Sequence, residues 1–380
     1  MKDVKEIIRI YTEKLNWIYS KANTKSKKKK IVYDLFSFSE ICHEHFNINE
    51  DFIWENDNEL ISLIVNPDMY FIDNILNSKI MFNNISNSVI TIFKDSKFPF
   101  YKNQGKVLNS LTPEKISEIV FDFISEYDNN LLKLYEDKLY NNEIFIGNLF
   151  ENTGGLTYQL NTLNKTWIFM NSELDYSILF ASTIVHELGH AYEDDILNKT
   201  GLSCHGLKTS CSPYYEVPSN FLEYAFLNYL KENKIYNSDA DIILSNYYID
   251  LFEYMYAINI LLKIYEINIT TNDYVEMEIK KEEIINYANE LNGQLNYYSY
   301  FSDLNNIVNY KNAFIYGIGH LMSLYLYEVY KENPKYFKKE FKNALINYYT
   351  EGINAFKGLN ITEEKLINNK VLSKVLKENR

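Results

Sequence analysis

Two histidines and a glutamate stand at helical spacing near the middle of the chain. Residues 182–193 read STIVHELGHAYE, so His186 and His190 are four positions apart and Glu187 follows the first of them. Residues four apart on a helix project from the same face, where two imidazoles can bind one metal ion. Glu187 flanks that face and could take a proton from a metal-bound water. The pattern predicts a zinc site that activates water.

The residues around the motif favour a buried helix. The ordinary alternative is a pair of surface histidines beside a salt-bridging glutamate. Against it, the neighbours are apolar or small: Ile184, Val185, Leu188, Gly189 and Ala191. Buried imidazoles need partners, and a metal ion would satisfy both. The sequence further predicts that this helix begins after an N-cap at Ser172 and stops at Gly201.

A catalytic zinc site needs a third protein ligand and one open position for water. Residues 215–226 read YEVPSNFLEYAF and lie in a predicted second helix that starts near Ser212. This segment carries Glu216 and Glu223 two turns apart, hence on one helix face. It therefore offers carboxylates that could complete the site.

Together, HELGHAYE and EVPSNFLEY resemble the thimet oligopeptidase and oligoendopeptidase F family of zinc metallopeptidases. The resemblance implies one Zn²⁺ per chain, held by His186, His190 and Glu216. It implies that Glu223 supports the ligand histidines from behind. It also implies that Glu187 is the general base, which takes a proton from the metal-activated water and passes it to the leaving amine.

The resemblance extends upstream of the motif. The segment GGLTYQLNTLNKTWIFMN has a glycine pair and many β-formers, which predicts a short hairpin or an edge strand. It looks like the Gly-rich strand segment of the family, along which a substrate peptide can lie. A strand edge binds a peptide through its backbone. The resemblance thus gives Gly154, Gly155, Leu156 and Tyr158 as substrate-binding residues.

Downstream, the segment NIVNYKNAFIYGIGHL resembles the Tyr-rich segment of the family. This places Tyr316 as the hydrogen-bond donor to the tetrahedral oxyanion. Two family positions differ, because Asn306 stands where the family has His and Asn309 where it has Tyr. Tyr310 is then the expected second tyrosine for substrate positioning. His320, one turn after Tyr316, is either a substitute for the missing imidazole or a packed core histidine.

The remaining sequence is dominated by helical patterns, with only 12 Gly and 6 Pro in 380 residues. We expect a mainly α fold: a large, two-lobed helical metallopeptidase with a deep cleft and one small β-hairpin or short sheet next to the metal-binding helix. Residues 1–145 are expected to form an N-terminal helical lobe, reduced relative to the family. Residues 146–380 are expected to form the zinc-peptidase catalytic region.

Charge and composition restrict the partners. A formal net charge of −13 disfavours nucleic acid and anionic membranes. No apolar run is long enough to span a membrane and the start of the chain lacks the apolar core of a signal peptide. Three cysteines do not make a disulfide framework. These features predict a cytoplasmic protein. The resemblance implies a short peptide as substrate, and we expect a monomer or small homo-oligomer.

The predicted function is a zinc-dependent endopeptidase that hydrolyses short oligopeptides. One alternative has the same chemistry but a narrower role, as a dedicated maturation protease for one cognate peptide. The other is a catalytically inactive, zinc-containing peptide-binding protein. The presence of Glu187 argues against the latter, because a pure binding protein has no need of a general base.

Overall fold

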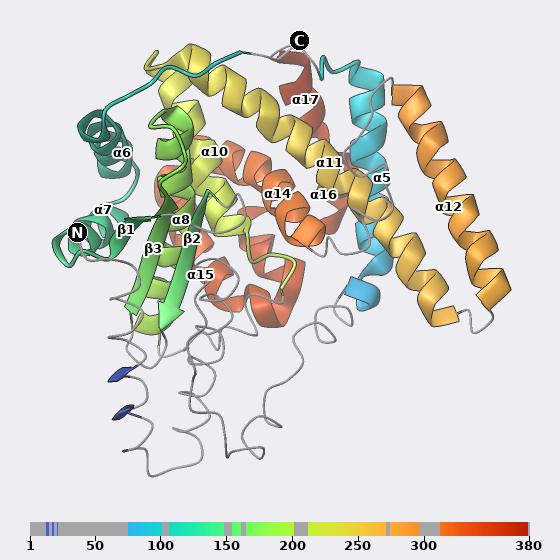
Figure 1. The fold of residues 1–380 in the computed structure, drawn as a ribbon, viewed down its shortest axis with the longest axis horizontal. Helices are drawn as coiled ribbons and strands as arrows, with labels where there is room; N and C mark the ends of the chain where they lie inside the picture. Colours follow the sequence, from blue (N-terminus) through green and yellow to red (C-terminus); the bar gives the residue numbers. More distant parts are fainter. Residues whose placement is uncertain are drawn as a thin grey trace. The chain divides into compact units, whose positions relative to one another are not determined.

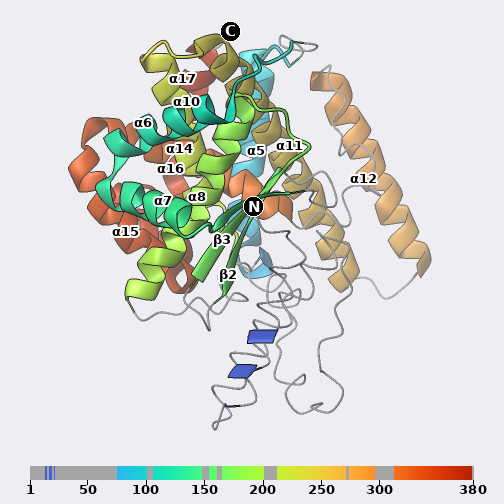
Figure 2. The same cartoon turned by 60° about the vertical axis from the view of Figure 1, so that its left-hand side comes forward.

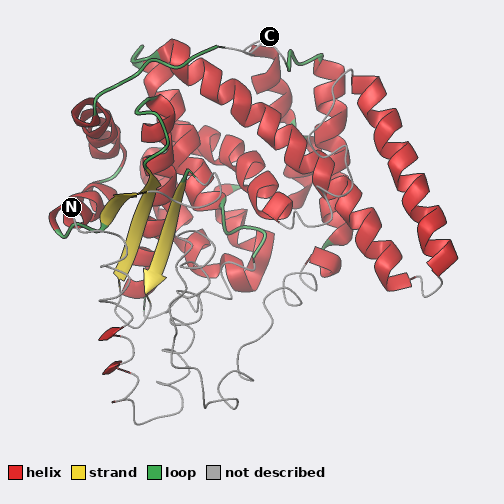
Figure 3. Ribbon diagram, in the orientation of Figure 1, coloured by secondary structure: helices red, strands yellow, loops and turns green. Residues whose placement is uncertain are grey.

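The computed structural model describes residues 13–14, 17–18, 21, 75–100, 106–147, 154–160, 165–200, 212–270, 274–295 and 312–378. These residues form a mainly helical structure with one small three-stranded sheet (Figure 3). This confirms the predicted mainly α fold with one short sheet. Tyr310 and the predicted helix stop at Gly201 lie outside the described residues.

The chain separates into two compact units, Met1–Tyr70 with Asn109–Cys211, and Phe71–Leu108 with Ser212–Arg380. This division differs from the single boundary that the sequence suggested near residue 145. Helices between residues 109 and 145 pack on the helix that carries the histidines, so they belong with it. Conversely, the helix α5 (Lys79–Ser96) packs on α11 (Asn237–Thr270) and belongs with the C-terminal part.

The first unit is built around the sheet and one long helix. Its elements are α6 (Pro113–Tyr127), α7 (Asn129–Tyr140), β1 (Ile144–Gly147), β2 (Gly155–Leu160), β3 (Lys165–Asn171) and α8 (Ile178–Lys199). The strand order is β1-β3-β2, with β1 parallel and β2 antiparallel to β3. The β2–β3 pair is the predicted hairpin, whereas β1 was not predicted. Helix α8 packs along the sheet (Figure 1), and α6 and α7 pack on α8 (Figure 2).

Helix α8 begins later than its sequence predicted. The cap is Ser177, whose hydroxyl accepts a hydrogen bond from the backbone N–H of Leu179 at 3.2 Å. Ser172 instead follows the end of β3, where its backbone N–H donates to the carbonyl of Gly147 at 2.7 Å. The pairing of β1 with β3 thus extends into the residue that was expected to cap the helix, and the cap lies five residues later.

The second unit is helical throughout its described part. Besides α5 and α11 it contains α10 (Val217–Glu232), α12 (Tyr274–Leu295), α14 (Asn312–Glu332), α15 (Pro334–Glu351), the 3-10 helix η3 (Gly352–Leu359), α16 (Glu363–Asn368) and α17 (Lys370–Glu378). Helices α10, α11 and α14 pack on one another, and α5 packs on α11. The rings of Phe93 and Phe252 meet at 5.3 Å between α5 and α11. Within the described residues, every helix is too short or too polar to cross a membrane.

Candidate metal centre

Helix α8 presents its two histidines as the sequence predicted. His186 and His190 lie one turn apart, with ring centroids 5.3 Å from each other and ring planes at 74°. The side chain of His190 is buried, with 6% exposed, and His186 is half-buried. Val185 and Leu188 are fully buried and hold the helix in the core of its unit. The two imidazoles are therefore fixed on a rigid helix.

Glu216 stands at the N-cap position of α10, directly before Val217. The predicted start of this helix at Ser212 was wrong, because residues 212–216 form turns and the helix proper begins at Val217. The Glu216 side chain is only 5% exposed. The hydroxyl of Ser219, one turn on, lies 2.7 Å from its Oε2 and 3.0 Å from its backbone oxygen. The positive end of the helix dipole also favours a carboxylate at this place.

The backbone of Glu216 is hydrogen-bonded as well as its side chain. Its carbonyl oxygen accepts hydrogen bonds from the backbone N–H of Asn220 at 3.0 Å and from Asn220 Nδ2 at 2.8 Å. Helix α14 approaches this turn closely at Gly319. A Cβ atom at Gly319 would lie 2.5 Å from Asn220 Nδ2 and 3.0 Å from the Glu216 oxygen. Only glycine permits this approach without a shift.

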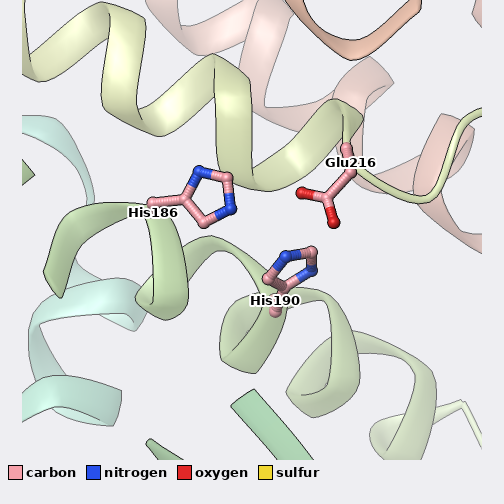
Figure 4. Close-up of side chains that lie close together, drawn as sticks. All are labelled: His186, His190 and Glu216. Atoms are coloured by element: carbon pink, nitrogen blue, oxygen red, sulfur yellow. The ribbon is translucent and has the colours of Figure 1, made fainter. Parts of the chain in front are cut away.

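His186, His190 and Glu216 each offer one potential ligand atom, and these atoms all lie within 4.8 Å of one another. Figure 4 shows the two imidazoles and the carboxylate pointing toward one another. Two imidazole nitrogens and a carboxylate oxygen are a donor set typical of catalytic zinc sites. Ligands of a tetrahedral zinc ion lie roughly 3–4 Å apart. The residues therefore fit such an ion in chemistry, and ligand atoms within 4.8 Å of one another would need to approach by at most about 1–2 Å to hold it.

Glu187, the predicted general base, is 5% exposed and faces strand β2. The hydroxyl of Thr157 on β2 lies 2.7 Å from Glu187 Oε2. Thr157 was not among the residues predicted from the sequence. The alternation of side chains along a strand could have found it, because Thr157 shares a strand face with Gly155.

The other predicted substrate-binding residues lie on or beside β2. Gly154, Gly155 and Leu156 are half-buried, and Tyr158 is buried. In the sheet formed by the described residues, β2 is an edge strand, which agrees with the predicted strand type. The role of these residues in binding a peptide stays a prediction.

The remaining predicted residues belong to α10 and α14. Tyr316 on α14 is half-buried and its ring stacks on that of Tyr254, 5.6 Å away. His320 is a packed histidine: its ring stacks on Tyr247 at 4.0 Å, and its Nδ1 lies 2.9 Å from the carbonyl oxygen of Tyr316. A ring nitrogen that bonds a carbonyl must carry the proton. Burial raises the pKa of Tyr247 well above its usual range, and the negative charge of Glu223 on α10 adds to this rise.

Comparison with known proteins shows the fold of the chain but not its sequence family. No protein-family profile and no curated protein matches the sequence. Solved structures do match. A candidate peptidase from Chlamydophila abortus has a TM-score of 0.56 at 14% identity, and the match covers 98% of this chain and 62% of that one. PZ peptidase A with an inhibitor has a TM-score of 0.55 at 11% identity over 79% of this chain and 58% of that one.

A candidate oligoendopeptidase F from Bacillus anthracis strain Ames also matches, with a TM-score of 0.53 at 12% identity over 92% of this chain. The matches cover 57–63% of the solved chains, so this chain spans about three-fifths of their length. At these identities the likeness concerns the fold alone. The chain has the fold of the solved oligoendopeptidase F structures and of related peptidases.

Proposed function

We propose that this protein is a zinc-dependent endopeptidase that cleaves short oligopeptides. The observation that carries the proposal is the convergence of His186, His190 and Glu216 within 4.8 Å. The fold shared with peptidase structures supports it. In a protein of net charge −13, two imidazoles that both face a buried carboxylate are well placed to bind a divalent cation.

Each chain residue has a distinct part in the proposed reaction. A zinc ion held by these three side chains would lower the pKa of its water and polarise the scissile carbonyl. Glu187 accepts the proton of the attacking water and returns it to the leaving amine. Tyr316 is proposed to donate a hydrogen bond to the carbonyl oxygen as charge develops there.

The peptide would lie along the outer edge of β2. The carbonyl of Gly154 accepts a hydrogen bond from Asn171 on β3 at 3.0 Å, which makes these two residues a hydrogen-bonded pair of the antiparallel ladder. Such pairs alternate along a ladder, so Leu156 also directs its backbone groups toward β3. The backbone groups of Gly155 and Thr157 then face the outer edge, where an extended peptide could pair with them.

Cleavage of a mixture of oligopeptides, followed by mass spectrometry, tests the proposal. We expect products with zinc present and none after treatment with a chelator. Glu187→Gln should keep zinc but lose cleavage by about 10²–10⁴-fold, the usual contribution of a general base. Glu173→Gln is the matched control, because Glu173 is exposed and lies outside helix α8. Full activity of Glu187→Gln would rule out the mechanism. Peptide binding without cleavage by the zinc-loaded protein would instead identify it as a binding protein.

A further inference from the structure

Strand β2 bears a small recess into which the side chain of Glu187 fits. Two residues of β2 form it, and both lie on the strand face that contacts α8. A Cβ atom added at Gly155 would lie 2.8 Å from Glu187 Cγ, 2.9 Å from Oε1 and 3.1 Å from Cδ. Thr157, two residues on, brings its hydroxyl 2.7 Å from Oε2. The glycine leaves room for the glutamate, and the threonine contacts its end.

The hydroxyl of Thr157 has two oxygens within reach. Besides Oε2 it lies 2.9 Å from the backbone oxygen of Glu187. A hydroxyl has one proton to donate, and a charged acceptor gives a hydrogen bond about twice as strong as a neutral one. The shorter distance is also the one to the carboxylate. The hydroxyl proton therefore goes to Oε2, and this fixes how the carboxylate is turned about its last bond.

A carboxylate without such a bond can rotate, because the terminal torsion of a glutamate is broad. Glu187 is 5% exposed, so little water is available to take over the role of Thr157. A displacement of about 1 Å at a reacting group can lower a rate by about 10²-fold.

We propose that Thr157 is a positioning residue that fixes the carboxylate of Glu187, and that Gly155 is required for the carboxylate to reach this position. This inference rests on the proposed function, since it gives the general base its orientation. It also gives strand β2 two functions. The backbone of Gly155 and Thr157 faces the edge proposed for the peptide, while the other side of the same two residues contacts the base. The strand would thus set the scissile bond and the base relative to each other.

Turnover of zinc-loaded variants gives the first test. Thr157→Val removes the hydroxyl at nearly constant volume, and we expect kcat to fall about 10–100-fold with KM and bound zinc unchanged. Thr157→Ser restores the hydroxyl and should stay within about threefold of the parent. Thr183→Val is the matched control, because among the described residues the Thr183 hydroxyl bonds the Leu179 carbonyl of its own helix, at 2.9 Å. The proposal is overturned by a normal kcat in Thr157→Val, or by an equal loss in Thr157→Ser.

Alanine substitutions at two glycines give a second, independent test. Gly155→Ala places its methyl group against a side chain, so the fold can absorb it by moving Glu187, and kcat should fall about tenfold or more. Gly293→Ala on α12 is the control, because no described atom lies within 4 Å of a Cβ added there. Equal activities of Gly155→Ala and Gly293→Ala would overturn the role of Gly155.

A measurement on metal-free protein separates this inference from the proposed function. Amide hydrogen exchange in α8 reports its local opening. When Thr157→Val is introduced into the parent protein, the protection of the α8 amides from exchange should fall about tenfold, because a hydrogen bond to a charged group is lost. In a Glu187→Ala background the loss should be about threefold or less, since only the neutral backbone acceptor remains. Equal losses of amide protection in both backgrounds would contradict the inference. A parent protein that cleaves no peptide would contradict the proposed function and leave this measurement valid.

Discussion

Replacing Gly319 should lower zinc affinity as well as the stability of the fold. An alanine there would put its Cβ 2.5 Å from Asn220 Nδ2, 3.0 Å from the Glu216 oxygen and 3.1 Å from the Glu216 carbonyl carbon. Reaching an ordinary contact of about 3.4 Å requires Asn220 Nδ2 to retreat by about 0.9 Å. Both atoms of Glu216 belong to the backbone, so the clash cannot be relieved by rotating a side chain alone.

The size of the effect follows from what must move. Adding a methyl group to a packed interior costs about 1–3 kcal/mol. The retreat of Asn220 also stretches its 2.8 Å bond to Glu216, which is worth about 0.5–1.5 kcal/mol. The higher helix propensity of alanine offsets about 1 kcal/mol of this cost. We therefore expect Gly319→Ala to lower the free energy of unfolding by about 0.5–3.5 kcal/mol. A displaced Glu216 should also lower zinc affinity about 10–100-fold.

Two other glycines provide controls for this experiment. Gly293 on α12 has no atom of the described residues within 4 Å of an added Cβ, so Gly293→Ala should keep both stability and zinc affinity. At Gly317 the added Cβ would lie 3.0 Å from Ile258 Cδ1 and 3.1 Å from Tyr254 Cβ, which are side-chain atoms of α11. Gly317→Ala should lower the thermal midpoint but affect zinc affinity far less than Gly319→Ala. Zinc titration against a chromophoric chelator, alongside thermal unfolding, measures both quantities. Equal zinc affinities of Gly319→Ala and the parent would refute the reasoning, as would an equal loss in Gly317→Ala.

Further substitutions test other parts of the structure. Ser219→Ala removes the hydroxyl beside Glu216 Oε2, and zinc affinity in the same titration should fall about tenfold. Tyr316→Phe should lower kcat for peptide cleavage by about 10²–10³-fold with bound zinc unchanged, as expected for loss of an oxyanion donor. Zinc at 100 times its dissociation constant should stabilise the parent by about 2.7 kcal/mol in thermal unfolding, and Glu216→Ala should lose most of this gain. Lys138→Met leaves Glu143 buried without the Lys138 Nζ that lies 3.3 Å from it, and should lower the free energy of unfolding in urea by about 3–5 kcal/mol.

Local patterns in the sequence were sufficient to predict the common face of the two histidines on α8 and the class of the fold. The spacing of His186 and His190 determines their common face in any helix, whatever surrounds it. The glycine pair and the β-formers between residues 154 and 171 likewise predicted the β2–β3 hairpin. These features depend on residues that are close in sequence, and the structure has them where they were expected.

Helix boundaries and partners from distant segments could not be predicted in the same way. Ser172 has a side chain suited to capping a helix, but its backbone N–H bonds to Gly147 at the end of the β1–β3 pair. The N-cap of α8 is therefore Ser177. Strand β1 has only four residues and gains its order from β3, which lies more than twenty residues downstream. Likewise, Glu216 was expected inside a helix, whereas turns precede it and the helix starts after it.

The two glycines that contact the acidic residues illustrate the limit most clearly. From the sequence, Gly155 was predicted to bind substrate, and Gly319 was given no role. In the structure each leaves space for a glutamate from another element: Gly155 for the side chain of Glu187, and Gly319 for the backbone of Glu216. Neither glycine has the left-handed backbone that usually explains the residue, so conformational freedom is not the reason for it. The reason is the absence of a Cβ atom at one contact, and a contact between segments distant in sequence is information that no local pattern contains. Because the first contact concerns the proposed proton acceptor and the second a proposed metal ligand, alanine at Gly155 should reduce turnover at unchanged zinc affinity, whereas turnover lost through alanine at Gly319 should recover as zinc is raised.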